Sequence, residues 1–375
     1  MGAGVLQGQS FAMPPEQAAR ELARTMAVPG LNLVLLFFSP RYATQAFAQA
    51  AAQAFAPARV VGCTTSGEFG PLGCRADSVA AMGFTAPAFA AATLLLPALD
   101  RFQAAAIAAP VRGLFPRAAP PHRALITLID GFSLKEELVV SALHSLAADV
   151  PLCGGSASDG SRLEQSWLLY DGRLHQNAAL VLGLASAAPL HVFKTEHFRP
   201  GEQRLVVTAA DSARRLVREL NGLPAAAEYA RLTGTSPERL DLAHFAEHPL
   251  MVRVGGANFI RSCIGVASDG GLRFACAIDV GLVLRLGQGQ DMACDIETAL
   301  TEVERKVGGP ADILGFDCLL RRQEMEHSGQ MDPIGALMRR HRLLGFSTFG
   351  EQFQGMHINQ TLTGIAFPRA GAPPR

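Results

Sequence analysis

The sequence has no excess of charge of either sign, because 33 Lys and Arg residues balance 33 Asp and Glu residues. This balance removes the general attraction to phosphate backbones that nucleic-acid-binding proteins use, so we expect no nucleic-acid partner. The sequence also lacks an uninterrupted apolar run of about 18 residues, the length that a membrane-spanning helix needs. Its first residues lack the basic and apolar regions of a signal peptide. We therefore expect neither membrane insertion nor secretion.

Cysteine pairs are missing as well. The seven cysteines are odd in number, scattered along the chain and nowhere spaced as C-x-x-C. This pattern indicates neither a disulfide framework nor a zinc ribbon, and it is typical of a reducing compartment. The absence of C-x-x-C-H excludes covalent attachment of haem. We expect the protein in the cytoplasm.

Apolar residues are plentiful. They make up 49% of the 375 residues, against 18% for charged residues. A chain of this length and composition can bury a large interior, which excludes global disorder. Its length predicts two domains, or one domain assembled from repeats.

One order of elements occurs three times along the chain. Each copy is predicted to contain a strand, a helix, a second strand, a glycine-containing turn and a closing strand. A strand-helix-strand order implies parallel neighbours, whereas a strand that returns after a short loop implies antiparallel pairing. We therefore predict an α/β (mixed α+β) fold, in which repeated strand-helix-strand units form mixed sheets flanked by helices. The predicted ranges are 31–38, 43–56, 58–61 and 78–84 in the first copy, 124–129, 134–148, 150–153 and 178–184 in the second, and 312–320, 334–340, 341–344 and 359–367 in the third.

The pattern changes between the second and third copies. Residues 211–220 (DSARRLVREL) predict a helix, with Asp211 as its N-cap and Gly222 just beyond its end. A compact antiparallel set of strands should follow, with a hairpin turn at 268–271 and a loop at 287–290. The resulting division is a helical lead-in at 1–28, an N-terminal domain at 29–205, a C-terminal domain at 206–368 and a tail at 369–375.

The glycine turns provide the best candidates for a functional site. Backbone N–H groups exposed where a strand ends can bind an anion or line a pocket, and the side chains converge if the copies pack around one centre. The alternative is that glycine only permits positive φ and close packing. The candidate pocket residues are Cys63, Thr64, Thr65, Gly67, Glu68, Gly154, Gly155, Ser156, Ser347, Gly350, Glu351 and Asn359.

Signals for catalysis are weak. The run Gly345-Phe346-Ser347-Thr348-Phe349 resembles a nucleophile elbow, but Phe349 replaces the second glycine and no helical segment clearly follows. We therefore expect no enzymatic activity. A hydrolase or transferase that uses the glycine turns as anion holes is the lesser alternative.

Four segments together resemble the N-terminal and C-terminal domains of the FIST family, in the family's order. They are GCTTSGE at 62–68, CGGSASDG at 153–160, LVVTAADSARRLVRELNGLPAAAEYA at 205–230 and GFSTFGEQFQGMHINQTLTG at 345–364. The resemblance covers nearly the whole chain. It implies two FIST subdomains and an intracellular sensory protein that binds a ligand and signals through a partner.

Three further segments are similar to the nitric-oxide-sensing FIST proteins: FDCLLRRQE at 316–324, FACAIDVGLVL at 274–284 and the ending GEQ…MHINQTLTG. This resemblance implies haem b held by a histidine, with His357 as the candidate iron ligand and His197 as its rival. It also implies a partner, either a sensor histidine kinase of a two-component system or a cyclic-di-nucleotide enzyme, whose output changes when nitric oxide binds. The alternative is a FIST sensor of a small metabolite such as an amino acid, without haem. A homodimer is compatible with either.

Overall fold

The element order that the sequence repeats is present in the structure, a computed structural model that describes residues 4–160 and 162–369. The first copy contains β1 (Val5–Ser10), α1 (Pro15–Thr25), β2 (Leu31–Phe38), α2 (Gln45–Ala54), β3 (Arg59–Thr64), β4 (Glu68–Phe69) and β5 (Val79–Thr85). The second contains β6 (Phe89–Leu96), α3 (Ala104–Gly113), β7 (His122–Asp130), α4 (Glu136–Leu146), β8 (Leu152–Ala157), β9 (Leu168–Tyr170), β10 (Arg173–His175) and β11 (Ala179–Ser186). The third contains β12 (His191–Thr195), α7 (Met292–Lys306), β21 (Ala311–Cys318), α8 (Leu319–His327), α9 (Met331–Arg340), β22 (Leu343–Thr348), β23 (Glu351–Phe353), β24 (Met356–Ile358) and β25 (Leu362–Pro368).

Each copy forms the centre of one mixed sheet, as predicted. The two strands joined by a helix are parallel (β2 with β3, β7 with β8, β21 with β22). The closing strand then pairs antiparallel with the first of them. Each copy also begins with a strand that the prediction missed, β1, β6 or β12, at the far side of the closing strand. The lead-in at 1–28, predicted to be helical, therefore contains β1 as well as α1, whereas the tail, apart from Arg369, lies outside the described residues.

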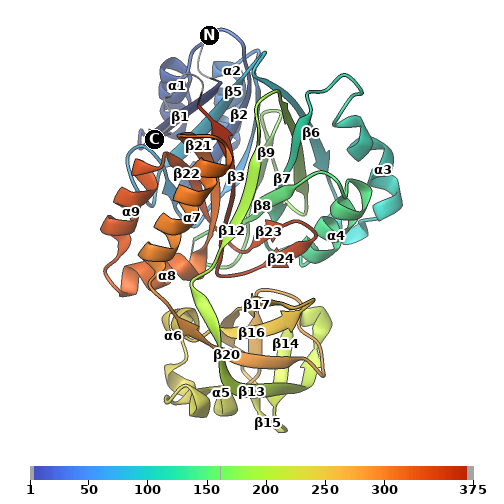
Figure 1. Cartoon of the computed structure of the whole chain (residues 1–375), viewed down its shortest axis with the longest axis vertical. Coiled ribbons are helices and arrows are strands. Elements are labelled where there is room, and N and C mark those ends of the chain that lie inside the picture. The colour runs from blue at the N-terminus through green and yellow to red at the C-terminus, as the bar shows by residue number, and fades with distance from the viewer. Residues whose placement is uncertain (1–3, 161, 370–375) are drawn as a thin grey trace.

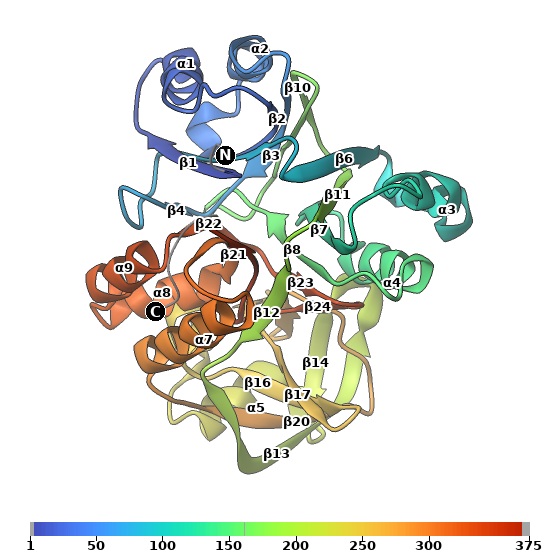
Figure 2. The ribbon, with the colours of Figure 1, turned by 45° about the horizontal axis from the view of Figure 1, so that its top comes forward.

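The three sheets are linked in a closed ring. The short strand after each turn joins the sheet of another copy: β4 pairs with β22, β23 with β8, and β9 with β3. The helices lie on the outside in three groups, α1 with α2, α3 with α4, and α7 with α8 and α9 (Figure 2). The inner faces share one apolar core, in which the ring of Phe346 stacks on Phe37 at 4.7 Å and meets the edge of Phe316 at 5.7 Å.

One glycine recurs at the same place in every copy, because two backbones approach closely there. An added Cβ would lie 1.9 Å from the carbonyl oxygen of Leu36 at Gly62, 2.2 Å from that of Thr127 at Gly154, and 1.8 Å from that of Gly315 at Gly345. Each of these carbonyls belongs to the neighbouring parallel strand. A side chain at any of the three positions would therefore push two paired strands apart.

We expect Gly345→Ala to lower the free energy of unfolding by about 3 kcal/mol, the upper part of the usual range for overpacking in a core. Urea denaturation followed by circular dichroism measures the change. The matched control is Gly113→Ala at the end of α3, where an added Cβ meets nothing within 4 Å. Equal stabilities of the two variants would contradict the close approach.

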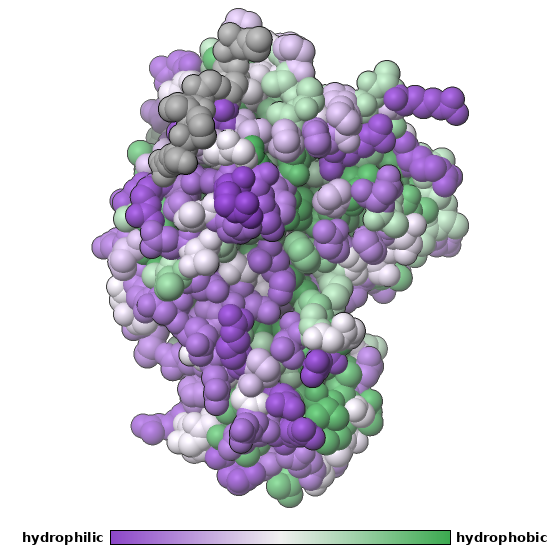
Figure 3. Space-filling view, viewed as in Figure 1, coloured by the Kyte–Doolittle hydropathy of each residue, from purple (hydrophilic) through white to green (hydrophobic). Residues whose placement is uncertain are grey.

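A small lobe, residues 198–289, is inserted between β12 and α7 of the third copy (Figure 1). The rest of the described chain forms the main lobe, and Figure 3 shows a narrower waist between the two. The third copy is therefore part of the main lobe, beside the first two. The boundary between the N-terminal and C-terminal domains, expected at 205/206, falls inside β13. The small lobe contains β13 (Phe198–Asp211), β14 (Leu216–Leu220), β15 (Leu223–Pro224), α5 (Ala225–Leu232), α6 (Leu242–Glu247), β16 (Leu250–Val254), β17 (Ala257–Arg261), β18 (Cys263–Val266), β19 (Leu272–Phe274) and β20 (Val283–Gly289).

The helix predicted at 211–220 is wrong. Asp211 does accept a hydrogen bond from the backbone of Arg214, but it caps only a single 3₁₀ turn, which Arg215 ends in the left-handed conformation. The chain then continues as β14, paired with β13 and β19. Asn221-Gly222 forms the hairpin turn between β14 and β15, with positive φ at both residues. Asn-Gly is a strong hairpin signal, whereas the sequence analysis placed Gly222 just beyond the end of a helix.

The loop predicted at 287–290 is also largely strand, since residues 287–289 belong to β20 and pair with residues 198–200 of β13. The hairpin turn at 268–271 is confirmed, because it joins the paired strands β18 and β19. No helix in the described part of the chain is long and apolar enough to cross a membrane.

Candidate functional site

The three glycine turns meet at one end of the ring of sheets. Hydrogen bonds between their backbones link them in a cycle. The N–H of Ser66 donates to Ser347 O (3.0 Å), that of Ser156 to Gly350 O (2.8 Å), and that of Ser158 to Thr64 O (3.1 Å). The structure thus brings the turns together, as parallel strands that end at one edge would suggest.

The first and third turns hold a buried glutamate in the same way. Glu351 accepts hydrogen bonds from the hydroxyl of Thr348 and from the backbone N–H (3.1 Å) and hydroxyl (2.8 Å) of Thr361. Glu68 repeats this arrangement with Thr65 and Ser78. Burial raises the pKa of Glu68 to about 7 and that of Glu351 to about 8, because the hydrogen bonds only partly offset the loss of solvation.

Most polar groups of the turns form hydrogen bonds with one another. The N–H groups of Ser347 and Phe349 donate to Gly67 O and Ser156 O, and the N–H of Gly350 donates to the hydroxyl of Thr348. An oxyanion hole needs N–H groups that point at the reacting atom. Ser347 itself lies in β22, which leads into another strand rather than into the helix of a nucleophile elbow. This arrangement gives no support to the anion-hole alternative.

A cavity lies where the third turn meets the small lobe, and we call it the lobe-interface cavity. The space in it that a water molecule can occupy is only about 10 Å³, and its walls are mostly apolar. The small lobe contributes Leu242, Ser262, Ile264 and Ala275. The main lobe contributes Leu163, Cys318, Leu319, Leu320, Thr348, Phe349 and Asn359.

Asn359 is the polar group in this cavity that has no partner. Its side chain is fully buried, and neither the amide oxygen nor the amide nitrogen has a hydrogen-bond partner among the described residues. A buried amide without partners costs roughly 1–3 kcal/mol. The amide of Asn359, at the wall of the cavity, therefore keeps an acceptor oxygen and two donor hydrogens that no described group uses.

Polar side chains bridge the two lobes around the cavity. Arg215 of the small lobe forms ion pairs with Glu136 (2.7 Å) and Glu137 (2.6 Å) at the start of α4. Gln360 of the main lobe accepts a hydrogen bond from Ser262 (3.0 Å) and donates to the carbonyl of Ala246 (2.7 Å). These polar links join the lobes together with a small apolar cluster of Ala246 in the small lobe and Cys318 and Leu320 in the main lobe.

His197, the rival haem ligand, lies at the connection into the small lobe. Its Nδ1 is 2.9 Å from a guanidinium nitrogen of Arg321, and its Nε2 is 2.9 Å from Glu324. An arginine can only donate, so Nδ1 accepts and Nε2–H donates, and burial lowers the pKa of His197. Neither nitrogen is free to bind iron.

His357, the preferred haem ligand, is buried in β24. Its Nε2 lies 3.4 Å from Ala275 O, and its Nδ1 lies 3.5 Å from the side-chain nitrogen of Gln352. The ring packs so closely on Gly350 that a Cβ there would be 2.3 Å from Cε1. His357 does not line the lobe-interface cavity. As placed, the two histidines do not fit an axial ligand of haem, and the described residues contain no group of three His, Cys, Asp or Glu side chains that could hold a metal ion.

Of the candidate pocket residues from the sequence, Asn359 lines the lobe-interface cavity. The others build the turns: Cys63 lies in the central core, Gly155 packs against Thr348, and Ser156 accepts a hydrogen bond from Gln352 (2.9 Å). The cavity residues from the small lobe and α8 were missed. No sequence signal could have found them, since apolar residues of an inserted lobe carry no motif.

The protein is thus a two-lobed α/β protein. Its main lobe contains three copies of one unit, its inserted lobe is antiparallel, and a cavity lies between the two. Comparison with protein families gives the family itself. The FIST N domain matches residues 32–223 and the FIST C domain matches residues 225–354, so the chain belongs to the FIST family. FIST domains are associated with sensing in signal transduction and are not catalytic. The FIST C match combines most of the small lobe with most of the third copy.

No curated protein matches the chain significantly in sequence. Among solved structures, one match is T. maritima PurL complexed with FGAR. That comparison gives 12% identity and a TM-score of 0.19 over 96% of this chain and 72% of the other. A similarity this low carries no argument about fold or function.

Proposed function

We propose that this FIST protein is a cytoplasmic sensor that binds a small metabolite in the lobe-interface cavity. The unpartnered amide of Asn359 is the observation that carries this proposal. In the ligand-free fold this amide costs stability, and a ligand that hydrogen-bonds to it would recover that cost. Functional sites are the places where proteins tolerate such local conflicts.

The size and chemistry of the cavity limit the ligand. In the observed arrangement the cavity offers about 10 Å³, room for about one water molecule, whereas small-molecule sites measure roughly 300–1,000 Å³. The small lobe must therefore move away from the main lobe to admit a ligand. The ligand should combine a small apolar part with a group that both donates and accepts hydrogen bonds, to match Asn359. A neutral or zwitterionic amino acid with an aliphatic side chain meets both requirements.

The signal would arise from a shift in the position of the small lobe. A ligand in this cavity touches both lobes, so its binding free energy depends on how they are arranged. Binding would favour the arrangement in which Ser262 and Asn359 face each other across the ligand. A sensor histidine kinase or another signalling enzyme would then read the altered surface.

Haem-based sensing of nitric oxide is the second hypothesis. Its structural support is the location of His357, whose Nε2 faces the small lobe at Ala275. It requires the small lobe to move away from His357, because the observed arrangement leaves no space for the macrocycle. We expect haem titration of the purified chain to give no stoichiometric Soret band. A band at one haem per chain that His357→Ala removes would contradict this expectation and replace the amino-acid proposal.

A thermal-shift screen of the 20 amino acids tests the main proposal. We expect at least one aliphatic amino acid to raise the melting temperature of the wild type but not of Asn359→Leu. Leucine replaces an unpartnered amide by an apolar group of similar size, so the variant should fold with unchanged or higher stability. Asn32→Leu is the matched control, since Asn32 also has an unpartnered amide oxygen but lies in β2. No shift with any amino acid would reject the proposed ligand class.

A further inference from the structure

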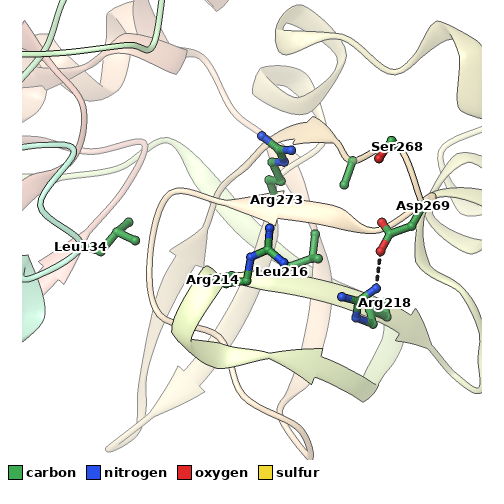
Figure 4. A pocket seen from close by; sticks show the side chains of 8 residues that line it. Leu134, Arg214, Leu216, Arg218, Ser268, Asp269 and Arg273 are labelled. Carbon is green, nitrogen blue, oxygen red and sulfur yellow. Dashed lines mark hydrogen bonds and ion pairs between the residues drawn. The ribbon is translucent and has the colours of Figure 1, made fainter.

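A second cleft between the lobes is lined by arginines. It has a volume of about 400 Å³ and lies between β14, β19 and the β18–β19 turn of the small lobe on one side and Leu134 of the main lobe on the other (Figure 4). Arg214, Arg218 and Arg273 contribute guanidinium groups, and Ser268 contributes a hydroxyl. Leu134 is 49% exposed and stands in the loop before α4.

The charge of this cleft is unbalanced. Three arginines face one carboxylate, Asp269, so three positive charges and one negative charge leave a net charge of +2. Asp269 forms an ion pair with Arg218. The side chains of Arg214 and Arg273 are exposed and have no hydrogen-bond or ion-pair partner among the described residues, and in Figure 4 they extend in the same direction.

The chain as a whole is neutral, so the positive charge of this cleft is a local feature and not a consequence of the net charge. Guanidinium groups bind carboxylate and phosphate oxygens in a planar, bidentate geometry, and two free arginines side by side suit a ligand with two or more anionic groups. A hydroxyl such as that of Ser268 adds a donor for one further oxygen. The volume exceeds that of the lobe-interface cavity, which suits a larger ligand.

We propose that this cleft is a binding site for a small polyanion, either a phosphate ester or a polycarboxylate, held by Arg214 and Arg273. The site is separate from the lobe-interface cavity and does not depend on the function proposed for it. Arg214 precedes Arg215, whose ion pairs with Glu136 and Glu137 join the lobes, and Leu134 precedes these two glutamates. A polyanion in the cleft therefore binds next to the main polar link between the lobes and acts as a second input to their arrangement.

Calorimetric titration of the full chain with pyrophosphate and, separately, with citrate tests the proposal and distinguishes the two ligand sources. We expect one of them to bind at low ionic strength and to bind at least ten-fold more weakly to the double variant Arg214→Gln/Arg273→Gln. Affinity should also fall as salt is added, since both contacts are exposed to solvent. The matched control is Arg112→Gln/Arg117→Gln, which removes two exposed positive charges at and after α3.

The variants replace exposed side chains, so their melting temperatures should equal that of the wild type. Stronger binding of pyrophosphate assigns the site to phosphate esters, and stronger binding of citrate assigns it to polycarboxylates. Failure of both to bind the wild type would overturn the proposal. Equal weakening in the two double variants would also overturn it, because the effect would then report overall charge.

Discussion

Arg215→Met is expected to lower the free energy of unfolding by about 3–5 kcal/mol, the usual cost of removing one partner of a buried ion pair. The Glu136 side chain is completely buried, and one of its oxygens has no hydrogen-bond partner among the described residues even with Arg215 in place. Burial by itself would raise the pKa of Glu137, but its interactions with His357 and Arg215 and the hydrogen bond from the N–H of Ala277 outweigh burial and lower that pKa. Loss of the arginine would leave Glu136 as an uncompensated charge between the lobes.

Urea denaturation at pH 7 measures this effect, and a second substitution separates its causes. Arg215→Met/Glu136→Leu should recover most of the lost stability, since replacing both members of a buried pair by apolar residues is often neutral. The control is Arg305→Met, which breaks an exposed pair with Glu302 on α7 and should cost less than about 1 kcal/mol. Equal effects of Arg215→Met and Arg305→Met would contradict the proposed importance of the link between the lobes.

Glu351→Gln should change how stability depends on pH. The folded-state pKa of Glu351 is raised to about 8 by burial, whereas an unfolded chain has a glutamate pKa of about 4.3. Between these values the folded protein keeps a proton that the unfolded chain releases, so stability falls as pH rises and the loss is complete above about pH 8. The expected loss is of the order of a few kcal/mol.

Glutamine keeps the hydrogen bonds of a neutral group and does not titrate. We expect the variant to match the wild type near pH 5 and to be more stable than the wild type near pH 9, as measured by thermal melting across this range. Glu68 has the same arrangement and a pKa of about 7, so Glu68→Gln should flatten the lower part of the curve. The exposed Glu297→Gln is the control, and a wild-type profile in Glu351→Gln would contradict the account.

The repeats were predictable because each combines a strong apolar strand with a glycine turn. The strand at 31–38 was predicted with its observed bounds, and the order in all three copies is as expected. The leading strands were missed, since β6 has a half-exposed pattern without clear alternation. The helix predicted at 211–220 failed because pairing with β13 and β19 overrides the local helical pattern.

The sequence also predicted that the turns carry polar groups that converge. It could not show that these groups would bind one another. Each of the short strands β4, β9 and β23 joins the sheet of another copy, and these pairings connect strands that are distant in sequence. For the same reason the lobe-interface cavity was not predictable beyond Asn359. Its other walls come from the inserted lobe, from α8 and from single residues at the ends of β21 and β22, which meet only in the folded protein.

Calorimetric titration with the amino acid that gives the largest thermal shift tests the central claim most directly. The account predicts one binding site per chain in the wild type and in Asn32→Leu, and no measurable binding in Asn359→Leu. Binding to Asn359→Leu with unchanged affinity would contradict the claim, because the ligand would then occupy a site away from the lobe-interface cavity.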